Sequence, residues 1–261
     1  MSNNNKPIII GGCHRSGTTL VRYLINSHSR IHCGPELGLM REIMQGFSPD
    51  PFSHLRFAHT AKAYISETEV RELFAQTACR LHEEAARRAG KPRWADKHPL
   101  NTLQLPLWNR VLKNDWHWLH VVRNPVDTIA SMIEIGFPLS LPVELESKIH
   151  WWRDMVEQGE AWRLANPDQS SRVDYETLVR QPESTLRRVM NELNEYYEPE
   201  QLSYQSDHNA LEDPKARTHP KPHTHSIGRG YRLLSASDIE TIIHQTDATC
   251  RRHNIHIPLP S

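Results

Sequence analysis

The feature that most constrains this chain is an apolar run near its start that ends in a glycine-bounded turn. Ile8-Ile-Ile leads into Gly11-Gly-Cys-His-Arg-Ser-Gly17, and the amphipathic stretch Thr18-Thr-Leu-Val-Arg-Tyr-Leu-Ile25 follows. This order predicts a buried strand, a tight turn and a helix. Because the backbone N–H groups at a helix start bind anions, we expect the turn to hold a phosphate-like group. The alternative is an ordinary core strand and helix joined by a glycine turn.

The turn lacks one residue of the common nucleotide-binding loop. Gly12 and Gly17 have the spacing of the GxxxxGK(S/T) pattern, yet Thr18 stands where that pattern has Lys, and a cation appears earlier, at Arg15. In the usual loop the Lys contacts the β- and γ-phosphates and the next hydroxyl holds magnesium. This turn instead offers a guanidinium, a helix start and three hydroxyls, which suit one compact tetrahedral anion without a metal ion. The hydroxyls belong to Ser16, Thr18 and Thr19.

Composition limits the class of protein. The 261 residues carry 31 Lys and Arg and 31 Asp and Glu, so the formal net charge is zero and no nucleic-acid partner is indicated. No apolar run reaches the roughly 20 residues that span a bilayer, and the first residues have no signal-peptide pattern. The four cysteines lack CxxC spacing, as is typical of reduced thiols. We expect one cytoplasmic domain over residues 1–261, with residues 1–6 flexible.

Strand-like and helix-like segments alternate along the chain. Arg30-Ile-His-Cys33 and Trp116-His-Trp-Leu-His-Val-Val122 have the character of buried strands, and Arg172-Val-Asp-Tyr175 resembles a further one. Ser66 and Glu69 form a capping box before a helical pattern. This alternation predicts a P-loop-type three-layer α/β sandwich, with a mainly parallel sheet and helices on both faces. Helices are expected over about residues 67–89, from 125 onward, and over 143–165, 183–195 and 237–252.

A polar stretch at about 204–230 predicts a long lid-like loop, because prolines stand among its His and Lys residues. Its histidines, His219, His223 and His225, are alternative metal ligands. The interleaved prolines and the lack of helical or CxxC spacing favour a solvated lid, so no metal site is expected.

Several polar side chains follow predicted strands, at the sheet edge where ligands of parallel sheets bind. Glu36 follows the strand at 30–33, and Arg123 ends the strand at 116–122. Ser131 lies eight residues after Arg123, inside the helix that Pro125 begins, so a turn cation and a helix hydroxyl can converge on a second anion. Two anion sites at one edge fit a nucleotide that is phosphorylated at both its 3′ and 5′ ends.

With these motifs in order, the chain resembles sulfotransferases that use 3′-phosphoadenosine 5′-phosphosulfate (PAPS). The likeness extends over about residues 7–190. Within the family, the chain most resembles the tyrosylprotein sulfotransferases, as a soluble member of bacterial type. The stretches that carry the likeness are Gly11-Gly-Cys-His-Arg-Ser-Gly-Thr-Thr19, Cys33-Gly-Pro-Glu36, Asp96-Lys-His-Pro99, Val122-Arg-Asn-Pro125 and Val173-Asp-Tyr-Glu-Thr-Leu178.

The resemblance implies a role for each motif. Glu36 matches the general base, and Lys97 and Arg15 match the cations at the transferred group. Arg123 and Ser131 match the pair that binds the 3′-phosphate. The loop that binds the 5′-phosphosulfate corresponds to His14, Arg15, Ser16, Gly17, Thr18 and Thr19. The remaining nucleotide contacts correspond to Tyr175, Ser226 and Arg229, with Lys221 as a further candidate.

The implied reaction is metal-independent, in-line transfer of a sulfuryl group to an acceptor hydroxyl or amine, with 3′,5′-bisphosphoadenosine (PAP) as the other product. The acceptor stays open among carbohydrate, lipid, phenol, small metabolite and peptidyl tyrosine, and a homodimer is equally open. Gly38 and Glu42 stand where tyrosylprotein enzymes have arginines that grip acidic peptides. Ala95 stands where those enzymes have the cysteine that pairs with the match of Cys33. These departures argue against an acidic peptide and for a reducing, cytoplasmic setting.

Alternatives stay open for the catalytic residues. His98 is the rival base, since cytosolic relatives use a His after their catalytic Lys. Glu36 is otherwise a solvated turn residue, and Lys97 a surface cation that pairs with Asp96.

Alternatives also stay open for other side chains and for the function. His14 either fills the loop or faces the acceptor, and Trp151 and Trp152 line the acceptor site or pack in the core. A P-loop kinase is one rival function, which the missing Lys disfavours. A non-catalytic PAP-binding protein is the other, in which the replacement of Glu36 changes nothing.

Overall fold

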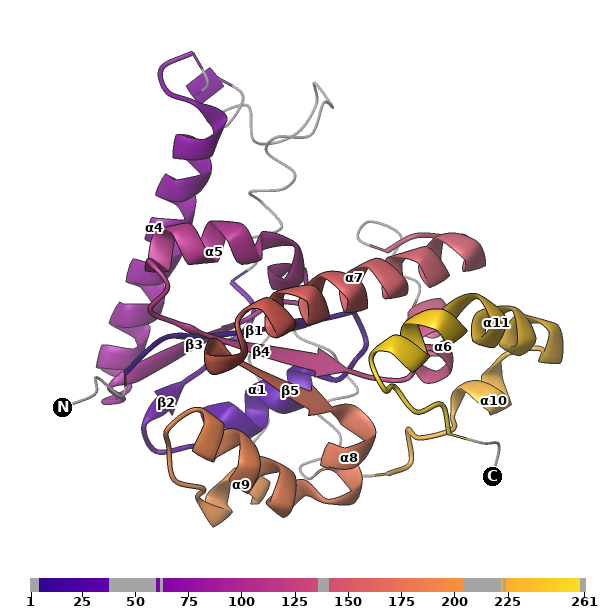
Figure 1. Cartoon of the computed structure of the whole chain (residues 1–261). Helices are drawn as coiled ribbons and strands as arrows, with labels where there is room; N and C mark the ends of the chain where they lie inside the picture. Colours follow the sequence, from indigo (N-terminus) through magenta and orange to yellow (C-terminus); the bar gives the residue numbers. More distant parts are fainter. Residues whose placement is uncertain are drawn as a thin grey trace.

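A computed structural model of the chain describes residues 5–37, 60–61, 63–135, 141–203, 222 and 224–258. Its centre is a sheet of five parallel strands in the order β2-β3-β1-β4-β5 (Figure 1). Because every neighbouring pair is parallel, the carboxyl ends of the strands lie at one edge of the sheet. The strands are Ile8–Gly12 (β1), Ile31–His32 (β2), Arg93–Lys97 (β3), His117–Val122 (β4) and Ser170–Asp174 (β5).

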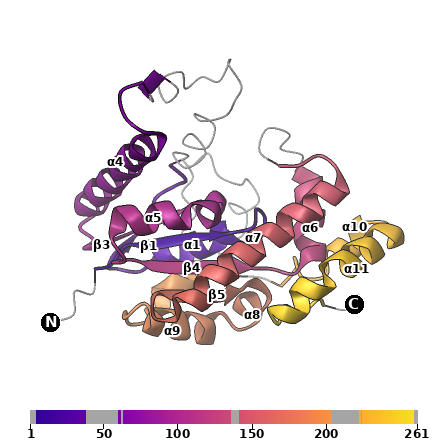
Figure 2. The same ribbon diagram turned by 45° about the horizontal axis from the view of Figure 1, so that its top comes forward.

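Helices cover both faces of this sheet, which confirms the predicted three-layer α/β sandwich. Figures 1 and 2 show α4, α5 and α7 across one face, α1, α8 and α9 across the other, and α6, α10 and α11 gathered at one end. The helices are Thr18–Asn26 (α1), Glu67–Arg88 (α4), Leu105–Leu112 (α5), Pro125–Ile135 (α6), Leu145–Ala165 (α7), Tyr175–Arg180 (α8), Pro182–Glu192 (α9), Gly230–Leu233 (α10) and Ala236–Arg252 (α11). Short 3-10 turns lie at Pro99–Gln104 (η1), Pro167–Gln169 (η2) and Pro199–Ser203 (η3).

The apolar run of β1 is explained by burial on two sides. Ile8 and Ile10 pack into the cluster that includes Val21 and Leu24 of α1. Ile9 points to the opposite face and packs among tryptophans of the neighbouring strands and of α5. A central parallel strand is apolar at every position because helices cover both of its faces.

One strand of the sheet escaped the sequence analysis. β3 has the polar sequence Arg-Trp-Ala-Asp-Lys, yet Arg93, Asp96 and Lys97 are at most 4% exposed. Arg93, for example, donates to the backbone oxygen of Leu193 at 2.7 Å. Hydropathy cannot indicate such a strand, because its burial depends on polar partners that are distant in the sequence.

The remaining differences are smaller. α5 and α8 were not predicted, and the helix expected at 183–195 lies at Pro182–Glu192. The predicted capping box is confirmed, with Ser66 Oγ accepting from the N–H of Glu69 at 3.3 Å and the Ser66 N–H donating to Glu69 Oε2 at 2.8 Å. Most of the expected lid-like loop at 204–230 and residues 1–4 lie outside the described residues. None of the described helices combines the length and the apolar character needed to cross a membrane.

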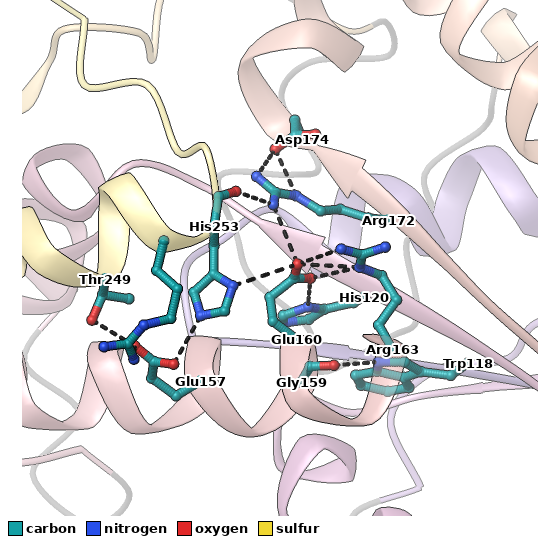
Figure 3. Close-up of polar contacts among 11 residues, drawn as sticks. Trp118, His120, Glu157, Gly159, Glu160, Arg163, Arg172, Asp174, Thr249 and His253 are labelled. Carbon is teal, nitrogen blue, oxygen red and sulfur yellow. Dashed lines mark hydrogen bonds and ion pairs between the residues drawn. The ribbon is translucent and has the colours of Figure 1, made fainter. Parts of the chain in front are cut away.

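A buried charge network joins strands β4 and β5 to α7 and to the end of α11 (Figure 3). Glu160 of α7 is fully buried and accepts from His120 of β4 at 2.9 Å and from Arg163 at 2.8 Å. Arg172 of β5 lies 3.4 Å from Glu160 and donates at 2.6 Å to the backbone oxygen of His253, which follows α11. One carboxylate therefore ties two strands and two helices together, a few residues before both strands reach the sheet edge.

We expect Glu160→Gln to destabilise the fold by about 3 kcal/mol, because the replacement removes the fully buried charge that pairs with Arg163 and Arg172. Burial alone would raise the pKa of Glu160, but hydrogen bonds from His120 and Arg163 hold it well below the ordinary value of 4.5. The stability contributed by Glu160 is therefore fully present above pH 4.5 and is lost as the pH falls further. Urea unfolding at several pH values should show a flatter acid dependence for the variant. Glu183→Gln, on the exposed side of α9, is the control and should match the wild type.

Candidate active site

The turn between β1 and α1 has the geometry of an anion cradle. Within this turn the N–H of Ser16 donates to the backbone oxygen of Cys13 at 3.1 Å. Arg15 and Gly17 have φ values of 69° and 98°. Gly12 is required by packing, because a Cβ there would lie 2.2 Å from the backbone oxygen of Val121. Gly17 precedes α1 and has no side chain that could cap it, so the first N–H groups of the helix are available to a ligand.

A second group of predicted residues lies against this turn. The Tyr175 ring packs on Gly17, where a Cβ would lie 2.3 Å from the ring, and Arg123 stacks on the same ring at 4.6 Å. The hydroxyl of Tyr175 lies 2.6 Å from Ser226 Oγ, and Arg123 donates to the backbone oxygen of Ser226 at 2.6 Å. The ends of β4 and β5 and the segment before α10 therefore meet at the turn.

The two predicted anion-binding groups are joined directly. Arg15 Nε donates to Ser131 Oγ at 3.1 Å, and Arg123 donates to the backbone oxygen of Arg15 at 3.2 Å. Asn124 caps α6, the helix that carries Ser131, since its Oδ1 accepts from the N–H of Asp127 at 2.9 Å. The structure thus brings Arg15, Arg123 and Ser131 together.

Lys97 lies at the centre of the third group. Its side chain is buried, and Nζ contacts Thr19 Oγ1 at 3.2 Å and pairs closely with Glu36 Oε1. Asp96 pairs instead with His82 on α4 at 2.8 Å. The alternative of a surface cation paired with Asp96 is therefore wrong. Glu36 is not a simple solvated turn residue either, since Lys97 holds one of its oxygens and His98 Nε2 lies 3.8 Å from the other.

These neighbours set the charge of Glu36. Partial burial raises the pKa of its carboxyl, but the charge and hydrogen bond of Lys97, with contributions from His98 and His14, lower it more, so that the pKa lies below the ordinary value of 4.5. Glu36 is therefore ionised at neutral pH and has an oxygen that can accept a proton.

His14 occupies the side of the turn that faces Glu36. Burial, followed by the charge of His98, lowers the pKa of His14 to about 3, so its imidazole is neutral at pH 7. His14 Nδ1 accepts from Trp151 Nε1 at 3.3 Å. Trp152 is fully buried in the core, and its Nε1 donates to the backbone oxygen of Arg123 at 3.2 Å. Of the two tryptophans, Trp151 therefore contacts a side chain of the turn, and Trp152 lies in the core and contacts the backbone of Arg123.

The sequence did not predict the residue that holds the segment from Ser226 to Gly230. Asp127, buried in the first turn of α6, accepts from the N–H groups of Gly228 at 2.9 Å and Gly230 at 2.7 Å. The signal in the sequence was an Asp in the first turn of a predicted helix. The partners of Asp127 lie about a hundred residues away, so their identity could not be predicted. Arg229, between these glycines, pairs with Glu134 on α6, and its predicted contact with a nucleotide stays a prediction.

Other expectations fall outside the described residues or concern metals and thiols. Lys221, His219, His223, Gly38 and Glu42 lie outside the described residues. Across the described part of the chain, no His, Cys, Asp and Glu side chains form a group of three that could hold a metal ion. All four cysteines are buried thiols.

We expect Gly17→Ala to destabilise the protein more than Gly90→Ala does. Both glycines have positive φ, 98° and 68°, so both replacements carry the backbone cost of about 1–2 kcal/mol. Only at Gly17 does the added Cβ also meet Tyr175, while nothing lies within 4 Å of it at Gly90. The clash should add about 1–3 kcal/mol, measured by urea unfolding. Equal losses for the two variants would show that Tyr175 does not pack on the turn.

Comparison with known proteins gives the family of this chain. Residues 7–199 match the sequence profile of the Sulfotransferase family. The chain is 30% identical over 202 residues to the protein-tyrosine sulfotransferase of Drosophila melanogaster. This match covers 74% of the chain but 39% of the fly protein, so the chain spans well under half the length of that relative.

Two solved structures share the fold. The sulfotransferase domain of the Synechococcus PCC 7002 olefin synthase is 19% identical, with a TM-score of 0.68 over 99% of this chain and 98% of that one. Mouse sulfotransferase SULT7A1, solved in complex with PAP, is 14% identical, with a TM-score of 0.57 over 94% of this chain and 85% of that one. The profile match over residues 7–199, which is most of the chain, places this chain in the sulfotransferase family.

Proposed function

We propose that this chain transfers a sulfuryl group from PAPS to an acceptor hydroxyl or amine, with Glu36 as the general base. The observation that carries the proposal is the position of Lys97, whose ammonium lies between the carboxylate of Glu36 and the first turn of α1. A base and an anion cradle that share one cation suit group transfer from an anionic donor.

The residues of the two turns fit the anionic ends of such a donor. Ser16 Oγ and Arg123 Nε are buried, and neither has a hydrogen-bond partner within the described ranges. Buried polar atoms are normally satisfied in native proteins, so an anion at each turn would complete their bonding. We assign the 5′ end to the loop from His14 to Thr19 and the 3′-phosphate to Arg123 and Ser131. Tyr175, Ser226 and Arg229 then lie on the nucleoside side.

The chain's own residues account for the chemistry. When bound, PAPS supplies the sulfuryl group. Glu36 accepts the proton of the acceptor hydroxyl as the acceptor oxygen forms its bond to sulfur. Lys97 and Arg15 stabilise the negative charge that develops on the leaving oxygen. The N–H groups of α1, with Thr18 and Thr19, hold the donor in the orientation that in-line transfer requires. No metal ion has a part in this scheme.

For the acceptor we propose a carbohydrate, a small metabolite or a peptidyl tyrosine. The fly relative is named for protein tyrosine, which keeps that acceptor in the set. We assign one wall of the acceptor side to His14, on which the charge of Glu36 acts, and to Trp151, whose ring packs against His14 with centroids 5.8 Å apart.

We expect Arg123→Ala to weaken the binding of PAP by about 10- to 100-fold, as the loss of hydrogen bonds to a charged group implies. Calorimetric titration of the purified protein with PAP measures the effect. Arg110→Ala removes an exposed arginine of α5 and serves as the control, with unchanged binding. If the wild type binds no PAP, the proposed donor is wrong.

We expect Glu36→Gln to reduce sulfuryl transfer by about 10²- to 10⁴-fold and to leave PAP binding within a few-fold of the wild type. The amide keeps the size of the side chain but cannot accept the proton. The assay follows radiolabelled sulfate from PAPS into a broad extract of sugars, metabolites and peptides, with Glu183→Gln as the control. Full activity of Glu36→Gln would remove Glu36 as the base.

A further inference from the structure

The backbone of His98 is fixed at the end of β3. Its N–H donates to the backbone oxygen of Ile10 at 3.2 Å, which continues the pairing of β3 with β1. His98 is also the residue before η1, and its side chain caps that 3-10 turn. The side chain is 9% exposed. The imidazole therefore has little freedom to turn.

The cap fixes which ring nitrogen carries the proton. The backbone N–H of Leu100 donates to His98 Nδ1 at 3.1 Å. A backbone N–H can only donate, so Nδ1 must accept and carries no hydrogen. The neutral imidazole then has its hydrogen on Nε2. A proton added to Nδ1 would face the N–H of Leu100 and break the cap.

The protonated nitrogen is the one that faces Glu36. Nε2 lies 3.8 Å from Glu36 Oε2, while Lys97 holds Oε1. The titratable groups that face Glu36 in the described chain are Lys97 and His98 from β3 and its end, and His14 from the β1–α1 turn. Lys97, the last residue of β3, thus pairs with one carboxylate oxygen, and His98, the next residue, faces the other at a distance longer than a direct hydrogen bond.

We infer that His98 is a positioning residue and not itself the base: its Nε2 hydrogen faces Glu36 Oε2 across 3.8 Å and favours the charge of the carboxylate through space, without a direct hydrogen bond. A nitrogen that already carries a hydrogen cannot take the proton of the acceptor, so His98 cannot exchange roles with Glu36 in this arrangement. The rival role would require a bare Nε2 and a hydrogen on Nδ1, where the backbone supplies a donor. This inference rests on the proposed function, since it concerns the base of the same reaction.

Two replacements separate the two ring nitrogens of His98. The amide oxygen of His98→Asn can take the place of Nδ1 and keep the cap of η1, but the Nε2 hydrogen that faces Glu36 Oε2 is lost, while Lys97 still pairs with Oε1. The longer amide of His98→Gln can place an N–H near the position of Nε2. His150→Asn, on the exposed side of α7, is the matched control. Melting temperatures of all variants are measured first, so that a loss of fold is recognised as such.

We expect His98→Asn to lower kcat about 10- to 100-fold, because the base is no longer held in place. The variant loses the Nε2 hydrogen that favours ionised Glu36, so the pKa of Glu36 rises. The acid limb of the kcat/KM profile then moves to higher pH by roughly 1 unit. The KM for PAPS should stay the same, and His98→Gln should recover most of the rate. A limb that stays in place, with both variants equally impaired, would reduce His98 to a structural residue and overturn the inference. Loss of all transfer in both variants, with Glu36→Gln still active, would make His98 the base.

A second measurement does not depend on activity. Nitrogen NMR of protein labelled at histidine should give His98 a bare Nδ1 and a protonated Nε2, with the signals assigned by their loss in His98→Asn. A hydrogen on Nδ1 in a protein that transfers sulfuryl groups would overturn this inference alone. A protein that binds no PAP and transfers nothing would overturn the proposed function, while the NMR result would still decide the state of His98.

Discussion

The buried ammonium of Lys97 is the constraint on which the site depends. A charge taken out of water must be paired, and this one is paired with Glu36 and bonded to Thr19. Three segments that are distant in the sequence therefore have to meet: the end of β3, the start of α1 and the turn after β2. The same requirement keeps Glu36 ionised, because the cation that needs a partner also lowers the pKa of that partner.

Local patterns predicted the parts of the fold that a short stretch of sequence makes visible. The run at Ile8, the glycines of the turn and the capping box at Ser66 are each recognised within a few residues, and each has the expected structure, although Gly12 and Gly17 pack on the distant Val121 and Tyr175. β3 was not predicted, because its polar residues are buried only through distant partners such as Leu193 and Glu36. A strand of this kind cannot be recognised from hydropathy, whatever the length of the window.

The site divides in the same way. The order of the strand ends was enough to bring Arg15, Arg123 and Tyr175 to one edge, since parallel strands present the same end. The hydrogen bond from the N–H of Gly228 to the carboxylate of Asp127 could not be predicted, because it joins a helix start to a loop about a hundred residues later. The ring nitrogen of His98 that carries the hydrogen could not be predicted either, because it depends on the backbone N–H of Leu100, which donates to Nδ1.

Helix α7 carries three residues that contact different parts of the molecule: Trp151, Trp152 and Glu160. Trp151 donates to His14, Trp152 donates to the backbone oxygen of Arg123, and Glu160 pairs with His120 of β4 and Arg172 of β5. Neighbouring residues on a helix cannot be displaced independently. Under the proposed function, a shift of α7 that moved Trp151 away from His14 would also disturb Arg123, so a gain in acceptor range would be coupled to a loss of donor affinity. A change of the Trp151 side chain alone would avoid this coupling, because the position of the helix is preserved.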